Sequence, residues 1–477
     1  MLRCRLPTAH AYHFFVVMST ADISFSNPFL CEGCEISGPY CLRNNCVKIP
    51  LDVFFTVDII ITAFYEKKVI SVHNSPRRLR IVNLEYALIQ GLYWVSFCGI
   101  VSYAAVYLQA RGYTNTQLGQ ILAVGYILGF LIPQLLAALI DRSEKITVYR
   151  CQWMLLLLQV VLVLLLRQLP GRSFAVSLLN VLLIGVEITL NPMNTEISVD
   201  LGLRIGHINY GAARGTGSIA FAPVSVLIGH LLEKIGPQIL PTVFLICIAL
   251  QAAALLLLCL SIRDVEGDAD LRRRNKSASS SFPQFYRENR RFFGVLAGVA
   301  LLFFTHNLVN NYLINGVRNV RGDTSDMGLI SGFTAVMEIP MMFLYDRLLR
   351  RFSCASTVRF ASSMFVFKAL AIALAPSMGG LYAANVLQLV SFAMITPAMV
   401  QYVILNIDPK DSAKGQALAF GMVTLGNILS SAIGGPLYDA LPVRSVLLIG
   451  VAAALLGAVF CHVFTRPAVR VAASAAC

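Results

Sequence analysis

Charged residues are scarce in this chain. Asp, Glu, Lys and Arg make up 13% of its 477 residues, whereas 57% are hydrophobic and the mean hydropathy is +0.70. Average soluble domains carry about a quarter charged residues, so this composition excludes an ordinary soluble protein and predicts a polytopic membrane protein. The hydrolase motifs H-E-x-x-H and G-x-S-x-G are absent as well. An enzyme is therefore not expected, and neither is a cofactor.

Apolar stretches of about 20 residues, long enough to cross a bilayer, recur along the chain. We expect an all-α protein whose twelve membrane-spanning helices lie near residues 84–109, 116–140, 146–166, 174–193, 211–232, 239–261, 292–315, 326–345, 355–375, 379–405, 416–437 and 443–464. Their boundaries are predicted to within a few residues.

The chain is expected to divide into five parts. These are a cytoplasmic tail that is poorly ordered or not native, a six-helix half, a cytoplasmic central loop, a second six-helix half and a short tail, over residues 1–82, 83–262, 263–290, 291–466 and 467–477. The N-terminus lacks the order of basic, apolar and small residues that marks a cleavable signal peptide, so none is expected.

Lys and Arg are unevenly distributed between the two sides of the predicted bundle. Most of the 38 lie on the side that carries the central loop. The opposite side holds Arg111, Arg167, Arg172, Lys234, Arg318, Arg321 and Arg444. The positive-inside rule then predicts a multi-pass protein of the plasma membrane with both termini in the cytoplasm. The net charge of +13 reflects this topology, and nucleic acid is not expected as a partner.

Four cysteines near the start have the spacing of a metal site. Cys31, Cys34, Cys41 and Cys46 form a C-x2-C-x6-C-x4-C set like those that bind zinc or iron–sulfur clusters. Their surroundings show no sign of a fold, so a metal site, a disordered tail and a misassigned start all stay open. The cysteines of the spans are interpreted as reduced and structural, and no metal is expected there.

The two predicted halves repeat each other in sequence. Three sets of residues recur at nearly the same offset, which argues for a parallel six-plus-six repeat with a substrate site at the midplane. The sets are Asp141-Arg142 with Asp346-Arg347, Gly211 and Gly217 with Gly415 and Gly421, and Gly229 and Glu233 with Gly435 and Asp439.

Three segments resemble the major facilitator superfamily. Asp141–Lys145 looks like a degraded form of the loop motif after the second helix, with Ala137 and Ser143 in place of its glycines. Asn209–Phe221 is similar to the fifth helix, and Glu338–Phe343 to the eighth, of the lactose-permease-like branch of oligosaccharide- and nucleoside-proton symporters. The resemblance implies two pseudo-symmetric six-helix halves and alternating access.

The resemblance also suggests roles for particular residues. Conformational gating would fall to the two loop pairs, Asp141 with Arg142 and Asp346 with Arg347. Where the branch has a histidine and an acid on its tenth helix, this chain has Gln388 and Ser391, so its coupling chemistry does not transfer unchanged.

Charged residues inside predicted spans are the candidates for proton coupling. An ionised side chain in hydrocarbon costs roughly 3 kcal/mol or more, so it usually faces a cavity or a partner. Glu338 is predicted to be the main proton-responsive acid and Lys368 its partner, although a static salt bridge between them is the alternative. His306 is a further candidate for coupling, or a hydrogen-bond donor.

Polar residues on the spans are the candidates for binding substrate. Arg214 begins the fifth span, where the permease-like pattern binds sugar, or it is an interfacial arginine. Glu187 shares a helical face with Asn191 and Asn194, and whether it or Glu196 pairs with Arg214 stays open. The remaining candidates are Asn307, Asn310, Asn311, Gln388, Tyr93 and Trp94. Their amides suit hydroxylated ligands, although hydrogen bonding between helices is the alternative.

These observations predict a secondary active transporter that moves a small polar solute by alternating access, as a proton-coupled symporter. The solute is a sugar or glycoside, a nucleoside or a small aromatic acid. A drug–proton antiporter is the alternative within transport, and a receptor or sensor without flux is the alternative outside it. The expected partners are the substrate, protons and the lipid bilayer, and a monomer is expected.

Overall fold

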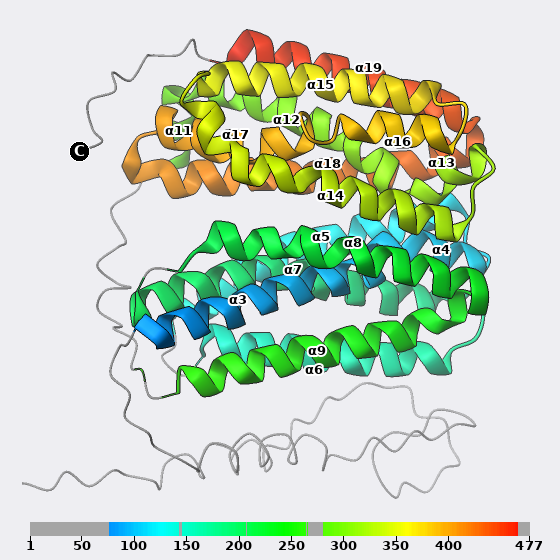
Figure 1. Ribbon diagram of the computed structural model, residues 1–477, viewed down its shortest axis with the longest axis horizontal. Helices are drawn as coiled ribbons and strands as arrows, with labels where there is room; N and C mark the ends of the chain where they lie inside the picture. The colour runs from blue at the N-terminus through cyan, green and yellow to red at the C-terminus, as the bar shows by residue number, and fades with distance from the viewer. Residues whose placement is uncertain (1–75, 143–145, 207, 264, 266–279, 466–477) are drawn as a thin grey trace, which may run out of the picture. The chain divides into compact units, whose positions relative to one another are not determined.

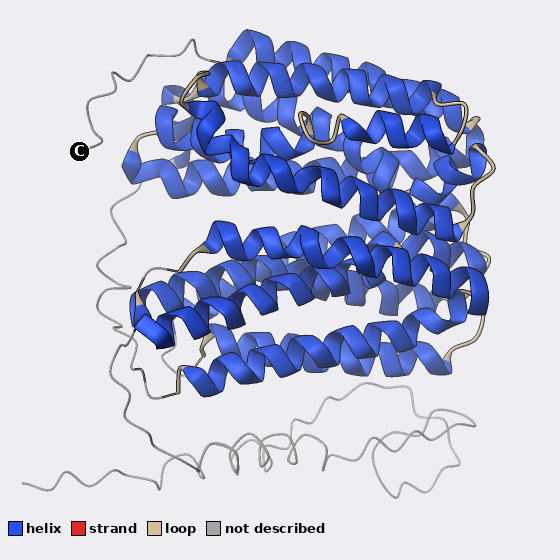
Figure 2. Cartoon of the chain, in the orientation of Figure 1, coloured by secondary structure: helices blue, strands red, loops and turns tan. Residues whose placement is uncertain are grey.

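The computed structural model describes residues 76–142, 146–206, 208–263, 265 and 280–465. Over this range the secondary structure is helical, and no strand occurs (Figure 2). The cysteine set Cys31, Cys34, Cys41 and Cys46, and the tails predicted around residues 1–75 and 467–477, lie outside the described residues. The predicted all-α fold is confirmed.

The N-terminal half contains six membrane-length segments. They are α3 (Pro76–Phe97) continued by the π-helix η1 (Cys98–Ser102) and α4 (Ala104–Ala110), then α5 (Asn115–Arg142), α6 (Val148–Gln168), α7 (Phe174–Ile205), α8 (Tyr210–Ile235) and α9 (Leu240–Ser261) after the 3-10 turn η2 (Pro237–Ile239). α3 begins at Pro76, within the segment assigned above to the tail. α7 runs to Ile205, well beyond the predicted end, because a proline such as Pro192 is tolerated where neighbouring helices surround the chain.

The C-terminal half follows the same plan. Its elements are the short α11 (Phe282–Glu288), α12 (Arg290–Asn310) with α13 (Leu313–Asn319), α14 (Thr324–Leu349), α15 (Cys354–Leu374), α16 (Met378–Val386) with α17 (Phe392–Asn406), the 3-10 turn η3 (Pro409–Asp411), α18 (Ser412–Ala440) and α19 (Val443–Phe464).

Eleven of the described helical segments are long and apolar enough to cross a membrane. The remaining predicted span, near 379–405, is divided into α16 and α17 by the turn Leu387–Ser391. In this turn the amides of Leu389 and Val390 bond to carbonyls three residues back rather than four. The arrangement is compatible with twelve spans, of which the tenth is built from two pieces.

Helix packing shows that the two halves are equivalent (Figure 1). α3 packs against α8 and α9 just as α12 packs against α18 and α19. α6 packs against α7 and α9, and α15 correspondingly packs against α17 and α19. Between the halves, α8 packs against α14 and α5 against α18, and these two pairs exchange under the same correspondence. The pseudo-symmetric architecture predicted from the repeat is confirmed.

Glycines bring the helices of the two halves into backbone contact. A Cβ atom on Gly229 would lie 2.7 Å from the carbonyl oxygen of Thr324, and one on Gly435 would lie 2.4 Å from that of Asn115. Small residues at helix crossings allow such close approach within a membrane. Gly229 and Gly435, which the sequence repeat pairs, therefore lie at the two equivalent crossings.

A carboxylate next to each crossing binds the first turn of a helix in the other half. The Asp439 carboxylate accepts hydrogen bonds from the backbone N–H groups of Asn115 (3.0 Å) and Thr116 (2.7 Å) and from both side chains. At the other crossing Glu233 accepts one from the Thr324 hydroxyl at 2.7 Å. Free N–H groups and the helix dipole make the start of a helix favourable for a negative charge. Each half thus holds the other through one acidic residue.

An amide cluster joins the halves at the same end of the bundle. The Gln109 side chain on α4 donates to Asn115 and to Asn315 on α13, both at 2.9 Å, and it accepts from Arg318 at 2.9 Å. We call this end, where α4 ends and α5 begins, the closed end, and the end where α3 begins and α19 ends the terminal end. In Figure 1 the closed end is at the right, where α4 and α13 lie together.

Replacing Asp439 by Asn should weaken closure at the closed end, because the charge at the start of α5 is lost. An exposed charge at a helix terminus contributes up to about 1 kcal/mol, which corresponds to roughly a fivefold shift toward opened molecules. Spin labels at R172C, in the loop before α7, and at R444C, in the first turn of α19, report the change as longer distances in double electron–electron resonance.

The Asp323→Asn variant is the matched control. The Asp323 carboxylate caps α14 within its own half, where it accepts from the backbone N–H of Asp326 at 2.8 Å. Its neutralisation should leave the distance distribution between the two labels unchanged. An equal effect of both variants would show that Asp439 supports its own half and does not hold the two halves together.

Candidate functional site

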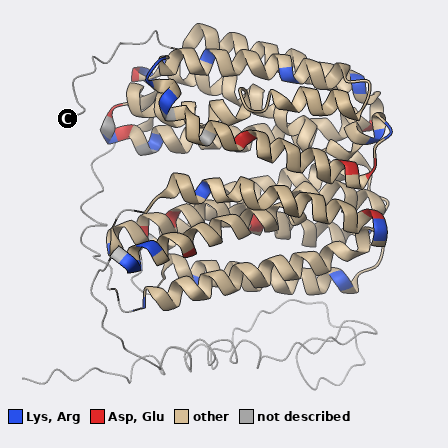
Figure 3. Cartoon of the chain, viewed as in Figure 1, with Lys and Arg blue, Asp and Glu red and all other residues tan. Residues whose placement is uncertain are grey.

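Charged side chains gather at the ends of the helices, and few lie between (Figure 3). Among the few are Lys368, which is 5% exposed, Glu187, which is fully buried, and the half-buried Arg214 and Glu338. Because a charge in hydrocarbon is costly, each of these residues requires a partner or a role.

In the C-terminal half, Gln388 connects Lys368 to Glu338. The Lys368 ammonium on α15 donates to the side-chain oxygen of Gln388, and the Gln388 amide nitrogen donates to Glu338 Oε1 on α14 at 2.8 Å. Gln388 lies in the turn that divides the tenth span. The structure therefore brings the predicted pair together through a third residue.

The chemistry of these groups fixes the direction of the chain of hydrogen bonds. An ammonium group can only donate, so the amide oxygen of Gln388 must face Lys368 and its NH2 group must face Glu338. Glu338 Oε1 is then an acceptor, as it is in a carboxylate. Lys368 thus supports the ionised form of Glu338 both by its charge and through the orientation of Gln388.

In the N-terminal half, Arg214 lies over the face of Trp94. The guanidinium carbon is 4.0 Å from the ring centroid, in the range of a cation–π interaction. Gly217 makes room for the ring, since a Cβ atom there would lie 2.3 Å from Trp94 Cδ1. Tyr93 packs edge-on against Trp94 with ring centroids 5.3 Å apart. No described residue accepts a hydrogen bond from Arg214, so its donors remain available to a ligand.

The two groups meet at Glu338. The Ser218 hydroxyl on α8, four residues after Arg214, donates to Glu338 Oε2 at 3.3 Å. Arg214 and Lys368 both attract the Glu338 carboxylate electrostatically. The site therefore contains two cations and one acid, contributed by both halves. The sequence analysis missed Ser218, although its helical spacing from Arg214 was a signal for it.

The polar residues of α12 differ in their neighbours. His306 stacks on Phe392 with ring centroids 4.5 Å apart, and its Nε2 lies 2.8 Å from the Asn310 amide nitrogen. Asn307 is buried, and its amide nitrogen has no partner. Asn311 instead donates to Ser431 at 2.9 Å, a hydrogen bond to α18. Asn307 and Asn310 remain candidates for ligand binding, and Asn311 contributes to helix packing.

Glu187 lies inside the N-terminal half. Its Oε2 atom accepts from Ser96 on α3 at 3.1 Å and from Gln159 on α6 at 2.6 Å, and the residue is fully buried. The face of α7 that carries Glu187, a predicted substrate-binding residue, is thus covered by α3 and α6 at this point. Periodicity indicates which residues share a face but not which helix packs against it.

The predicted gating pairs lie at the ends of α5 and α14. Asp141 and Arg142 close α5, and Asp346 and Arg347 come near the end of α14. The side chains of Asp141, Arg142 and Asp346 are outside the described set, so their gating role stays a prediction. In the described part of the chain, no three His, Cys, Asp or Glu residues are grouped as a metal site requires.

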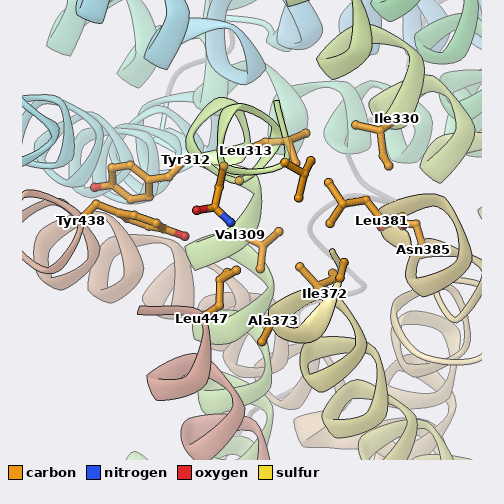
Figure 4. Close-up of a pocket in the computed structure, with 14 residues that line it drawn as sticks. Val309, Tyr312, Leu313, Ile330, Ile372, Ala373, Leu381, Asn385, Tyr438 and Leu447 are labelled. Atoms are coloured by element: carbon orange, nitrogen blue, oxygen red, sulfur yellow. Dashed lines mark hydrogen bonds between the residues drawn. The ribbon is translucent and has the colours of Figure 1, made fainter. Parts of the chain in front are cut away.

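A separate small cavity lies within the C-terminal half, near the closed end (Figure 4). Val309, Leu313, Ile372, Leu381 and Leu447 contribute to its largely apolar lining. Its volume of about 20 Å³ holds a single water molecule at most. This cavity is too small for an organic solute, so the site around Glu338 remains the candidate.

Comparison with known proteins shows which proteins this chain resembles in sequence and fold. The MFS_1 like family model matches residues 84–448. An uncharacterized transporter of Bacillus subtilis (strain 168), YwbF, is 22% identical over 77% of this chain and 90% of its own. The maltose permease of Geobacillus stearothermophilus is 27% identical over 49% of this chain and 57% of its own. The crystal structure of a mutant of the nucleoside transporter NupG superposes with a TM-score of 0.68 at 14% identity, over 81% of this chain and 100% of that one.

The fold and the family match define a membrane transporter of the major facilitator type, which confirms the resemblance seen in the sequence. The chain belongs to the MFS_1 like family.

Replacing Gly217 by Ala should displace the Trp94 ring and with it the Arg214 guanidinium, because the new methyl group would overlap the ring. In a Trp153→Phe background Trp94 is the only tryptophan, so its fluorescence reports the change directly. We expect a shifted emission spectrum and a loss of transport of about tenfold, the size of effect that follows from misplacing a binding group.

Gly421→Ala is the matched control, because this glycine is paired with Gly217 in the sequence repeat. A Cβ atom at Gly421 would have ordinary contact with Phe130 at 3.7 Å. Its fluorescence and transport should match the parent protein. An unchanged Trp94 spectrum in Gly217→Ala would refute the predicted packing of Trp94 on α8.

Proposed function

We propose that this protein is a proton-coupled symporter that carries a small polar solute between its two halves. One observation carries the proposal: Glu338 bonds through one oxygen to Gln388 in its own half and through the other to Ser218 in the opposite half. A single carboxyl group, whose charge depends on protonation, thus contacts both halves.

The surrounding donors determine where a proton binds. Oε1 faces the amide NH2 group of Gln388, which cannot accept a hydrogen bond, so a proton there would break that contact. Oε2 faces the Ser218 hydroxyl, which can turn from donor to acceptor. Protonation at Oε2 keeps both neighbours but removes the negative charge that attracts Arg214 and Lys368. These two side chains then become free to bind substrate.

The same groups support a hydrophilic substrate with oxygen acceptors. Once Glu338 is neutral, the site presents the forked donors of Arg214, the ammonium of Lys368 and the aromatic platform of Trp94. Hydroxyl, carbonyl or carboxylate oxygens on a ring would match these donors. Similarity to a maltose permease and to a nucleoside transporter supports a sugar, glycoside or nucleoside, and a small aromatic acid fits the two cations.

We further propose a plasma-membrane location with the terminal end in the cytoplasm, on the strength of the Lys and Arg bias. In that orientation the closed end faces outward. The hydrogen bonds of Asp439 and Gln109 then close the outer side while substrate exchanges with the cytoplasm.

Glu338→Gln should abolish uphill uptake driven by a pH gradient in proteoliposomes, while exchange of labelled for unlabelled solute survives. Exchange needs no deprotonation step, whereas accumulation does. A panel of glycosides, nucleosides and aromatic acids identifies the solute in the same assay. Glu288→Gln, which neutralises an exposed acid on α11, is the control and should accumulate solute normally. Normal gradient-driven accumulation by Glu338→Gln would refute the mechanism.

Lys368→Met should slow turnover, because Glu338 then loses both the nearby charge and the donor that orients Gln388. The double variant of Lys368→Met with Glu338→Gln should be more stable than Lys368→Met alone, since no acid is left without its partner. It should still fail to accumulate solute. Stability is measured by thermal unfolding in detergent and accumulation by the uptake assay. Equal uptake by Lys368→Met and the parent protein would contradict the assigned role of Lys368.

A further inference from the structure

A row of polar side chains lies between α6 and α7 inside the N-terminal half. Three pairs bridge the two helices: Gln159 donates to Glu187 at 2.6 Å, Gln152 to Asn194 at 2.7 Å and Tyr149 to Asp200 at 2.9 Å. α6 begins at the terminal end, where Tyr149 lies in its first turn, and runs inward. The pairs therefore lead from the terminal end of the bundle to Glu187 in its interior.

This row of side chains has an acidic residue at each end. At the terminal end, Asp200 is held by Arg204 at 2.6 Å and is 6% exposed. At the inner end, Glu187 receives hydrogen bonds from two neutral donors, Ser96 and Gln159, and no cation is paired with it among the described residues. An isolated carboxylate in an apolar interior is strongly disfavoured, so such a group binds a proton or gains a partner.

Several buried atoms along the row have no hydrogen-bond partner in the part of the chain that the structure describes. They are Glu187 Oε1, Gln159 Oε1, Gln152 Oε1, Asn194 Nδ2 and, on the adjoining α3, Gln90 Oε1. An unpartnered buried polar atom is unfavourable if it stays dry, and only a few occur per hundred residues of an ordinary protein. Four of them belong to the two inner pairs, and together they indicate ordered water, which both accepts and donates protons.

We propose that Glu187 is a second proton-binding site, separate from Glu338 and loaded from the terminal end through water held along α6 and α7. The proton binds Oε1, the oxygen without a partner, and converts the carboxylate to the neutral acid. Each water on the path receives one proton and passes on another, so no charge remains behind. Gln152, Gln159 and Asn194 are positioning residues that hold this water.

Among the described residues no charged group faces Glu187, so its carboxylate is stabilised only by the hydrogen bonds from Ser96 and Gln159. The titratable neighbours that interact with it electrostatically are the Tyr93 hydroxyl on α3 and the Cys247 thiol on α9, which are neutral at physiological pH. Its contact on α6 is the uncharged Gln159. The occupancy of Glu187 therefore depends on the water path and on the movement of α3, α6 and α7 around it.

Infrared difference spectroscopy tests the proposal without knowledge of the solute. The full-length protein in liposomes is titrated from alkaline to acidic pH, and the carboxylic C=O band is recorded in H2O and in D2O. We expect a pH-dependent band that is lost in Glu187→Gln and kept in Glu338→Gln. Should Glu187→Gln fail to fold, Glu187→Asp keeps the acid and should shift the band.

The path is tested by the rate at which the band shifts after transfer to D2O. Gln152→Leu removes one water-holding amide and should slow that shift roughly tenfold, the equivalent of losing one polar contact in the path. Asn191→Leu is the control: it removes an amide of α7 that belongs to none of the three pairs, and it should leave the rate unchanged. A Glu187 band that does not change with pH, or a rate unaffected by Gln152→Leu, would overturn the proposal.

Discussion

The cost of a charge in hydrocarbon is the constraint on which this structure depends. Glu338 reduces that cost through its contacts with Gln388, which binds Lys368, and with Ser218 of the other half, and through electrostatic attraction to Arg214. The cost is lowest only while the halves are correctly placed. The attraction between the charges of the site therefore also holds the two halves together.

Closure at one end has a different physical basis. There the helices approach until backbone meets backbone at Gly229 and Gly435. Asp439 accepts from N–H groups at the start of the facing helix, and Glu233 accepts from the Thr324 hydroxyl. Both contacts are short-ranged and directional, so they are lost together when the helices separate. Long-range attraction at the centre combined with short-range contacts at one end suits a two-state mechanism.

Much of the fold could be predicted from the sequence, because apolar runs and the repeat of Gly229 and Glu233 with Gly435 and Asp439 are local signals. Arg214, Glu338 and Lys368 were recognisable because charge is so rare in such runs. The burial of Glu187 by α3 and α6 was not predictable, since periodicity does not identify the neighbouring helix. The division of the tenth span was hidden as well, because residues 387–391 contain neither the glycine nor the proline that usually marks a break.

That division has an evolutionary consequence. In a continuous helix, one inserted or deleted residue rotates everything beyond it by about 100°. Here the turn Leu387–Ser391 lies between α16 and α17, so a change of length within α17 can be absorbed without turning Gln388 away from Lys368 and Glu338. The terminal part of this span can therefore diverge while the bridging amide keeps its place.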